Sequence, residues 1–353
     1  MPRTPPKIIA IVGPTASGKT EMAIRLAKKF GGELVSADSR TIYRGLDIGT
    51  AKSRDFPHHL IDIVPPWKAL TLAEWKRRAI RAIRDILRRG KVPILVGGTG
   101  LYVSALIENW KVPKVPPDPQ LRARLTRRSI ASLLRELQKR DPASAAAIDP
   151  VRGRPPDTVG TATTVLGPVR SSPPAGPYGR ASAGATSNGM GRSASNGIDP
   201  KNKRRLIRAL EVCIKTGKPF SALREKGEPL FDALLVGIRI PRQKLYARID
   251  ARVDAQMRAG WLKETEAVLQ KLRRRLPERE IWKLPGMSGL GYRELGAHLR
   301  GKTTLPEAVA FIKRDTRRYA KRQLTWWRRE KRIHWVRTGP EAERLARAFL
   351  YTP

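Results

Sequence analysis

The chain has 353 residues, which is enough for one large domain or two ordinary ones. Hydrophobic residues make up 40 % of it, so most of the chain is expected to fold. No stretch approaches the roughly 20 apolar residues of a membrane span, and no secretory signal precedes the first apolar run. A soluble cytoplasmic protein is predicted. The single cysteine, Cys213, excludes a disulfide framework and a multi-cysteine zinc site.

The charge balance is strongly basic. Lys and Arg number 71 against 31 Asp and Glu, which leaves a net charge of +40. This excess favours a polyanionic partner such as a nucleic acid, although a host with a generally basic proteome would explain part of it. Charge alone does not distinguish DNA from RNA.

Short apolar runs alternate with amphipathic stretches along the first 110 residues. A helix is predicted over 72–89, where apolar residues recur at helical spacing and Gly90 follows as a terminator. Strands separated by helices are typical of an α/β fold with a parallel sheet wrapped by helices. The predicted strands are 7–12, 33–37, 60–64 and 92–96, with a later return to the sheet at 233–240.

The middle of the chain changes character. A helix is predicted over 121–147, but 151–200 is rich in Gly, Pro, Ser and Ala and cannot bury a core. The triplet Ile-Asp-Pro at 148–150 recurs at 198–200, so we interpret 151–200 as an insertion in a loop; an RNA-binding tail is the alternative. The predicted organisation is a core begun by 1–110, a helical insertion formed by 111–150 and 201–230, and a return to the core with a basic helical region in 231–353.

A phosphate-binding loop follows the first predicted strand. The octapeptide Gly13-Pro14-Thr15-Ala16-Ser17-Gly18-Lys19-Thr20 fits the pattern GxxxxGK[ST] between a strand and a helix. Its glycines let backbone N–H groups surround a phosphate, Lys19 supplies a positive charge, and the Thr20 hydroxyl can bind Mg²⁺. The loop does not show whether the anion is ATP or another pyrophosphate.

Two polar residues follow predicted strands at the edge where ligands of α/β sheets bind. Asp38 ends the second strand; its carboxylate can act as a general base or hold Mg²⁺ through water, or it can simply cap a turn. Thr99 follows Gly97-Gly98 after the fourth strand, where it can bind substrate or form a tight turn.

The stretch 313–332 is basic and contains aromatic residues. Ten Lys or Arg accompany only Asp315 and Glu330, with Tyr319, Trp326 and Trp327 between them. Cationic groups bind the phosphate backbone of nucleic acids. We expect the Trp side chains to lie in the core and the Lys and Arg side chains to face RNA.

These motifs together resemble the tRNA dimethylallyltransferase (tRNA isopentenyltransferase) family in its bacterial form. The resemblance covers nearly the whole chain apart from 151–200. It is carried by seven segments in order: GPTASGKT at 13–20, ELVSADSRTIYRGLDIGTAK at 33–52, PHHLIDI at 57–63, PILVGGTGLY at 93–102, RRLIRALEV at 204–212, LYARIDARVDAQM at 245–257 and GLGYRE at 289–294.

The resemblance implies a fold related to P-loop NTPases and a prenyl transfer reaction. The phosphate-binding loop would hold dimethylallyl diphosphate with Mg²⁺, the metal being bound by Thr20 and by Asp38 through water. Asp38 would be the general base for N6 of adenine, Thr99 would contact the base, and Arg252 would neutralise the diphosphate. The positions expected to contact the anticodon stem-loop of tRNA are Asp38, Ser39, Arg40, Thr41, Thr99, Arg122, Arg204, Arg205, Leu206, Ile207, Arg208, Ser288, Gly291, Tyr292 and Arg293.

Three other functions share some of these features. A small-molecule or nucleotide kinase would place ATP in the same loop, and an isopentenyltransferase acting on free AMP would need no extended RNA surface. A non-catalytic RNA-binding protein would not need the intact Lys19, Thr20 and Asp38. We expect a monomer that acts on tRNA.

Overall fold

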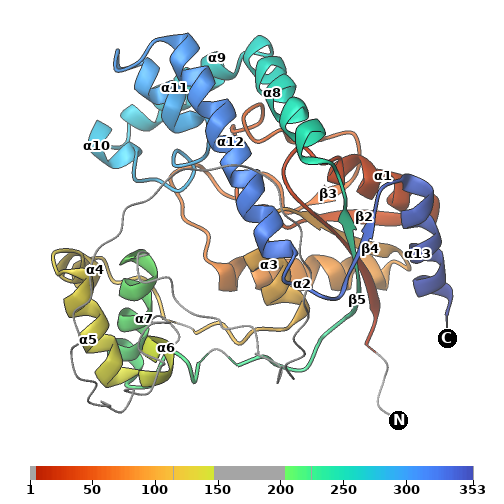
Figure 1. The fold of residues 1–353 in the computed structure, drawn as a ribbon, viewed down its shortest axis with the longest axis horizontal. Coiled ribbons are helices and arrows are strands. Elements are labelled where there is room, and N and C mark those ends of the chain that lie inside the picture. Colours follow the sequence, from red (N-terminus) through yellow and green to blue (C-terminus); the bar gives the residue numbers. More distant parts are fainter. Residues whose placement is uncertain (1–4, 114, 147–202, 224, 353) are drawn as a thin grey trace, which may run out of the picture. The chain divides into compact units, whose positions relative to one another are not determined.

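The computed structural model describes residues 5–113, 115–146, 203–223 and 225–352 (Figure 1). They belong to two compact units: unit 1 consists of Met1–Lys114 and Arg224–Pro353, and unit 2 is Val115–Leu223. The predicted insertion at 151–200 lies outside the described residues.

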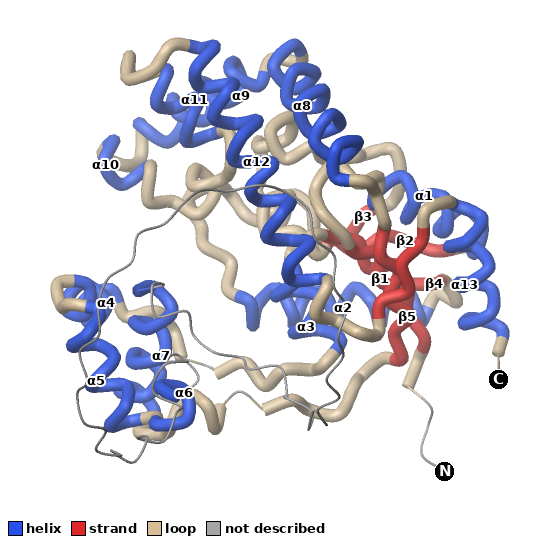
Figure 2. The backbone as a smooth tube through the Cα atoms, in the orientation of Figure 1, coloured by secondary structure: helices blue, strands red, loops and turns tan. Residues whose placement is uncertain are grey.

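Unit 1 is built on a parallel sheet of six strands, drawn in red in Figure 2. Their order in the sheet is β3-β2-β4-β1-β5-β6. The strands span β1 Lys7–Val12, β2 Gly32–Ser36, β3 His58–His59, β4 Val92–Gly97, β5 Asp232–Ile238 and β6 Ile333–Val336. The prediction of an α/β fold with a parallel sheet is therefore confirmed.

One predicted strand is wrong. The apolar run 60–64 forms turns, and the third strand is the pair of histidines just before it, which bonds to β2. Leu60 and Asp62 have positive φ angles of 66° and 54°, a left-handed conformation that interrupts extended backbone. The pattern of apolar residues in the sequence does not predict these φ angles. The strand β6 was not predicted, because it is short and follows a highly charged segment.

Helices cover both faces of the sheet. The predicted helix at 72–89 is α2, which begins after a capping box between Thr71 and Glu74 and ends just before Gly90, whose φ is 68°. The helices of unit 1 are α1 Lys19–Phe30, α2 Leu72–Arg88, α3 Gly100–Ile107, α8 Arg242–Arg258, α9 Trp261–Arg273, α10 Glu278–Ile281, α11 Tyr292–His298, α12 Leu305–Trp327 and α13 Gly339–Tyr351.

Two hydrophobic cores result. On one face, buried side chains of α1 and α13 pack against alternate strand residues such as Ile9, Leu34 and Val236. On the other face, the larger core joins the remaining strand residues to α2, α3, α9, α11 and α12. Burial on both faces explains why the strands read as nearly continuous apolar runs. No helix among the described residues is long and apolar enough to cross a membrane.

Unit 2 is helical in its described residues. It contains α4 Pro119–Thr126, α5 Ile130–Arg140, α6 Pro142–Ala146 and α7 Lys203–Thr216. The single helix predicted over 121–147 is wrong, because Ser129 caps a new helix through the N–H of Ser132 and Pro142 starts another. Its core includes Leu133, Leu137 and Leu210, each 0 % exposed.

Candidate active site

The loop 13–20 joins the end of β1 to the start of α1, as the sequence predicts. Gly13 and Gly18 have φ angles of 145° and 92°, which favour glycine, and Ala16 adopts a φ of 60°. The Lys19 ammonium donates a hydrogen bond to the carbonyl oxygen of Pro14. The Ser17 hydroxyl is buried and has no hydrogen-bond partner in the structure. The loop therefore has a free hydroxyl and an α-helix N-terminus available for an anion.

A residue far along the chain connects this loop to a second turn. The Gln323 side chain in α12 accepts a hydrogen bond from the Thr15 N–H at 2.8 Å and donates one to the Gly98 carbonyl oxygen at 2.9 Å. A Cβ atom at Gly98 would lie 2.1 Å from the Gln323 amide nitrogen, so any larger residue there would have to displace this side chain. Sequence analysis missed Gln323, because an isolated Gln in a helix belongs to no recognisable motif.

Asp38 and Thr99 lie at the carboxyl ends of β2 and β4, and the structure brings them together. The backbone N–H of Thr99 donates a hydrogen bond to the Ala37 carbonyl oxygen at 3.3 Å. The backbone N–H of Ser39 donates one to the Thr99 hydroxyl at 3.2 Å. The Asp38 carboxylate accepts a hydrogen bond from the Arg40 N–H at 2.8 Å. The turn-capping role considered for Asp38 is thus real, and its carboxylate also lines the cavities described below.

Two buried cations lie near Asp38. Burial lowers the pKa of Lys19 to about 8, although the Asp38 carboxylate opposes the shift and Arg252 reinforces it. Burial also lowers the pKa of Arg252, again opposed by Asp38. These mutual influences place one carboxylate and two cations within electrostatic range in a poorly solvated site, which is a good environment for a polyphosphate.

Three cavities adjoin at Arg252, which lines all of them. The first, of about 590 Å³, follows the phosphate-binding loop from Ala16 to Glu21. The second, here called the inner pocket, measures about 110 Å³ and is lined by Lys19, Thr20 and Asp38. The third, here called the outer cavity, measures about 440 Å³ and is lined by Asp38, Thr99 and Arg252. Asp38 therefore borders both the inner pocket and the outer cavity.

The outer cavity has an aromatic wall that includes Tyr319 of α12. Burial and the nearby Asp38 carboxylate raise the pKa of Tyr319 to about 12. The phenol is therefore neutral at physiological pH.

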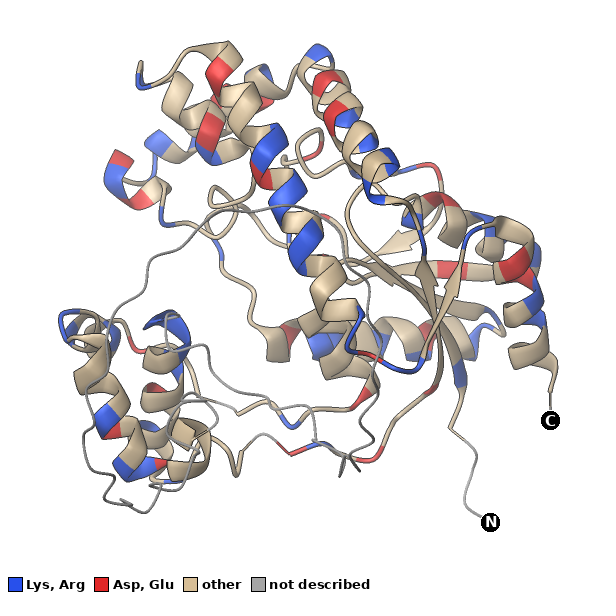
Figure 3. Cartoon of the chain, viewed as in Figure 1, with Lys and Arg blue, Asp and Glu red and all other residues tan. Residues whose placement is uncertain are grey.

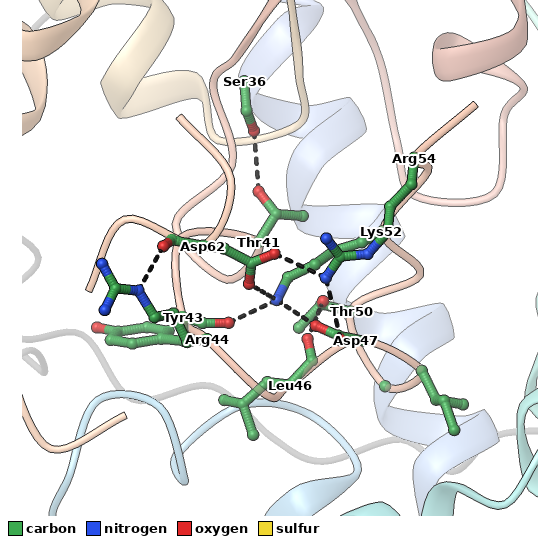
Figure 4. Close-up of polar contacts among 12 residues, drawn as sticks. Ser36, Thr41, Tyr43, Arg44, Leu46, Asp47, Thr50, Lys52, Arg54 and Asp62 are labelled. Atoms are coloured by element: carbon green, nitrogen blue, oxygen red, sulfur yellow. Dashed lines mark hydrogen bonds and ion pairs between the residues drawn. The ribbon is translucent and has the colours of Figure 1, made fainter. Parts of the chain in front are cut away.

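The segment after Asp38 is held by a buried lysine (Figure 4). The Lys52 ammonium, with its side chain 1 % exposed, donates to the Tyr43 carbonyl and pairs with Asp47 and Asp62. The Arg54 guanidinium pairs with the same two carboxylates. This network closes the loop that presents Ser39, Arg40 and Thr41; the Thr41 hydroxyl lies 2.9 Å from the Ser36 hydroxyl and lines the inner pocket.

A second anchor of this loop is Glu264 in α9. Its carboxylate accepts hydrogen bonds from the N–H groups of Asp47 and Ile48, both at 2.8 Å, and from the Tyr292 hydroxyl at 2.6 Å. Tyr292 is buried and lines the outer cavity, as does Ser288. Near them, Gly291 packs against Trp261, and Arg293 is exposed beside Glu294. Ser288 also binds the Arg40 guanidinium at 3.3 Å.

The basic stretch 313–332 lies mainly in α12, whose Lys and Arg are blue in Figure 3. Not all of these cations are available to a ligand. Arg317 pairs with Asp250 at 2.6 Å and Lys313 with Asp254 at 2.6 Å. The prediction for the tryptophans is confirmed for Trp327, which is buried, but is wrong for Trp326, which is 36 % exposed.

In unit 2, several residues expected to contact tRNA form ion pairs or pack within the unit. The Glu211 carboxylate, 0 % exposed, pairs with Arg122 at 2.7 Å and with Arg208 at 2.5 Å. Leu206 and Ile207 are buried in the core of the unit. Their side chains pack inside the unit, and a contact of these two residues with tRNA stays a prediction. Arg204 and Arg205 are exposed on α7.

The donor set fits a hard cation held together with a polyphosphate. No group of three or more His, Cys, Asp and Glu side chains among the described residues could hold a metal by itself. The unpartnered Ser17 hydroxyl and the Thr20 hydroxyl beside the inner pocket offer oxygen ligands instead. Mg²⁺ commonly keeps several waters and takes its remaining oxygens from one or two protein groups and a substrate phosphate.

Comparisons with known proteins identify the family of this chain. A family model described as IPP transferase matches residues 41–154 and 188–330, and one described as isopentenyl transferase matches residues 6–60. The chain is 41 % identical over 331 residues to a tRNA dimethylallyltransferase of Roseiflexus sp. (strain RS-1), covering 91 % of this chain and 90 % of the relative. It is 40 % identical over 337 residues to one of Thermomicrobium roseum, covering 93 % of this chain and 85 % of the relative.

Solved structures of transferases are also similar to this chain. The tRNA isopentenylpyrophosphate transferase of Bacillus halodurans matches with a TM-score of 0.60 and 32 % identity, covering 98 % of this chain and 95 % of that chain. A eukaryotic dimethylallyltransferase acting on tRNA shares the fold, with a TM-score of 0.73 at 24 % identity over 98 % of this chain and 79 % of that chain. This chain belongs to the tRNA dimethylallyltransferase family.

Proposed function

We propose that this protein transfers the dimethylallyl group of dimethylallyl diphosphate to N6 of the adenine on the 3′ side of the anticodon in tRNA, giving N6-isopentenyladenosine. The observation that carries the proposal is that Asp38 borders both the inner pocket beside Lys19 and the outer cavity beside Thr99. A diphosphate on one side and a base on the other would meet at this carboxylate.

In the proposed reaction, N6 attacks the first carbon of the dimethylallyl group while the bond from that carbon to the diphosphate oxygen breaks. The electron pair leaves with the diphosphate, and Asp38 accepts a proton from N6. The exocyclic amine of adenine is a weak nucleophile, so a positioned carboxylate contributes directly. Lys19 and Arg252 stabilise the charge that develops on the leaving group.

Mg²⁺, held by the diphosphate and the Thr20 hydroxyl and by Asp38 through water, would supply further charge neutralisation. Loop N–H groups and the hydroxyls of Thr15, Ser17 and Thr20 would orient the diphosphate. Thr99, whose hydroxyl accepts a hydrogen bond from the Ser39 N–H, would hydrogen-bond the base, which must leave its stack to enter a cavity of this kind.

The tRNA would approach the outer cavity at Ser39, Arg40, Ser288 and Arg322, which line it. Exposed cations of α12, and Arg204 and Arg205 on α7, would contact the phosphate backbone. We further propose that the protein works as a monomer, since the described residues of unit 1 supply the phosphate loop, the carboxylate and the cations of the site.

The test is transfer of radiolabelled dimethylallyl to unmodified tRNA with free AMP and ATP in parallel. The proposal requires label in tRNA, and none when the target adenine is replaced. Label in AMP alone would indicate an enzyme of free nucleotides. ATP turnover without prenyl transfer would indicate a kinase.

A further inference from the structure

His58 in strand β3 is a half-buried residue with buried ring nitrogens, and the proposed reaction does not use it. It pairs with Leu34 of β2, whose side chain lies on the face of the sheet covered by α1. Its neighbour His59 points to the opposite face, as alternation along a strand requires, and binds Glu33 at 2.7 Å. The two histidines therefore have different surroundings, and only His59 has a protein partner on its ring.

Both ring nitrogens of His58 are buried and neither has a hydrogen-bond partner in the structure. Burial, reinforced by His59, lowers the pKa of His58 to about 4, so the ring is neutral at physiological pH. A neutral imidazole has one N–H donor and one acceptor nitrogen. Leaving either one unpaired in a buried position is unfavourable, which indicates that a ligand or its water completes the site.

The surroundings indicate what that ligand is. His58 lines the inner pocket together with Lys19, Thr20 and Arg252. Ser36, two residues beyond Leu34 on the same face of β2, also lines it. Three cations (Lys19, Lys52 and Arg252), the Asp38 carboxylate and several hydroxyls surround this space of about 110 Å³. The excess of positive charge suits an anionic oxygen and a few ordered waters.

We propose that His58 is a further ligand-binding residue of this site, whose ring N–H donates a hydrogen bond to an oxygen of the hydrated diphosphate held in the inner pocket. The inference rests on the proposed function only for the identity of the anion. A neutral donor suits this position, because it stabilises the diphosphate before and after the transfer without adding another charge beside Lys19, Lys52 and Arg252.

The test is the affinity for inorganic pyrophosphate in the presence of Mg²⁺, measured by isothermal titration calorimetry. His58→Phe keeps a ring of similar size but removes both nitrogens, and it is expected to weaken pyrophosphate binding about tenfold or more. His58→Gln keeps a donor and is expected to recover part of the affinity. The matched control is His59→Gln, which alters the neighbouring ring on the other face and is expected to bind pyrophosphate like the wild type.

Affinity for an anticodon stem-loop RNA is measured on the same variants. A merely structural role for His58 would weaken both ligands together, whereas the proposal requires a loss confined to pyrophosphate. Unchanged pyrophosphate affinity in a folded His58→Phe protein would overturn the proposal. If that variant does not fold, ring ¹⁵N resonances of the wild type decide: His58 signals that stay unmoved on addition of pyrophosphate and Mg²⁺ would also overturn it.

Failure of this inference is distinguishable from failure of the proposed function. A wild type that prenylates tRNA while His58→Phe binds pyrophosphate normally would remove only the role of His58. A wild type that binds pyrophosphate through His58 but transfers nothing to tRNA would remove the proposed function and leave the phosphate contact in place.

Discussion

The side-chain oxygen of Gln323 accepts a hydrogen bond from the Thr15 N–H at 2.8 Å, which links α12 to the phosphate-binding loop across 308 residues of sequence. The amide nitrogen of the same side chain binds the Gly98 carbonyl oxygen. One buried amide thus sets the spacing between the loop that would hold the diphosphate and the turn that carries Thr99.

Replacement of Gln323 by Leu is expected to lower kcat/KM for prenyl transfer by about ten- to a hundredfold. It leaves a backbone donor and a backbone acceptor unpaired, at a cost of roughly 1–3 kcal/mol for each buried group, and misplaces the two loops. The control is Gln270→Leu, which makes the same change at an exposed position of α9. Equal activity of the two variants would show that the bridge does not position the site.

Gln323 is a residue of the site whose role could not be predicted from the sequence. The phosphate-binding loop could be predicted because its conformation is encoded locally by Gly13, Gly18 and their spacing. Gln323 and Glu264 could not be predicted, because each acts on backbone groups more than 200 residues away. The failed strand at 60–64 has a similar cause, since the left-handed Leu60 and Asp62 depend on tertiary contacts and not on hydrophobic pattern.

Binding of pyrophosphate is expected to weaken as pH rises through about 8. The pKa of Lys19 is lowered to about 8 by burial, so its ammonium loses its proton there and no longer attracts the anion; Asp38 and Arg252 are the charged groups that influence it most. Affinity measured at pH 7 and pH 9 is expected to fall about tenfold in the wild type. The control is Lys19→Arg, whose guanidinium stays charged at both pH values. Any change in its affinity therefore measures the titration of pyrophosphate itself. Parallel pH profiles for the two proteins would contradict the assignment.

The exposed cations of α12 are expected to carry part of the salt dependence of tRNA binding. Changing Arg318, Lys321 and Arg322 to Ala should reduce the slope of log affinity against log salt by about 2, since each phosphate contact contributes about 0.7–0.9. Arg317 is left intact because it is half-buried and pairs with Asp250, whereas Arg318 stays largely exposed beside Asp315.

The control for this experiment removes the same charge elsewhere. Lys28, Arg344 and Arg347 are exposed on α1 and α13, on the other side of the sheet. Their replacement by Ala should leave the slope near that of the wild type. If both triple variants lower the slope equally, the effect reflects net charge and the RNA does not lie along α12.

Glu211→Gln is expected to destabilise unit 2 by about 2 kcal/mol, because a neutral amide replaces the buried carboxylate that accepts charged hydrogen bonds from Arg122 and Arg208. These arginines keep the pKa of Glu211 below its ordinary value in spite of burial, which opposes them. The stabilisation is therefore present above the ordinary pKa of Glu and is lost as pH falls.

Chemical unfolding monitored at pH 7 and pH 4 measures this effect. Glu136→Gln, which breaks the more exposed pairs with Arg128 and Arg140, is the control and is expected to cost about 1 kcal/mol or less. A loss in Glu211→Gln no larger than in the control would mean that the buried cluster does not stabilise the unit.

The most direct test of the central claim is prenyl transfer by Asp38→Asn, which keeps the size of the side chain and its acceptor for the Arg40 N–H. We measure label passing from dimethylallyl diphosphate to tRNA, together with binding of pyrophosphate and of the anticodon stem-loop. The account predicts transfer in the wild type and a loss of at least about a hundredfold in the variant, larger than the change in binding of either ligand. Transfer by Asp38→Asn at the rate of the wild type would contradict the assignment of Asp38 as the base that accepts the N6 proton.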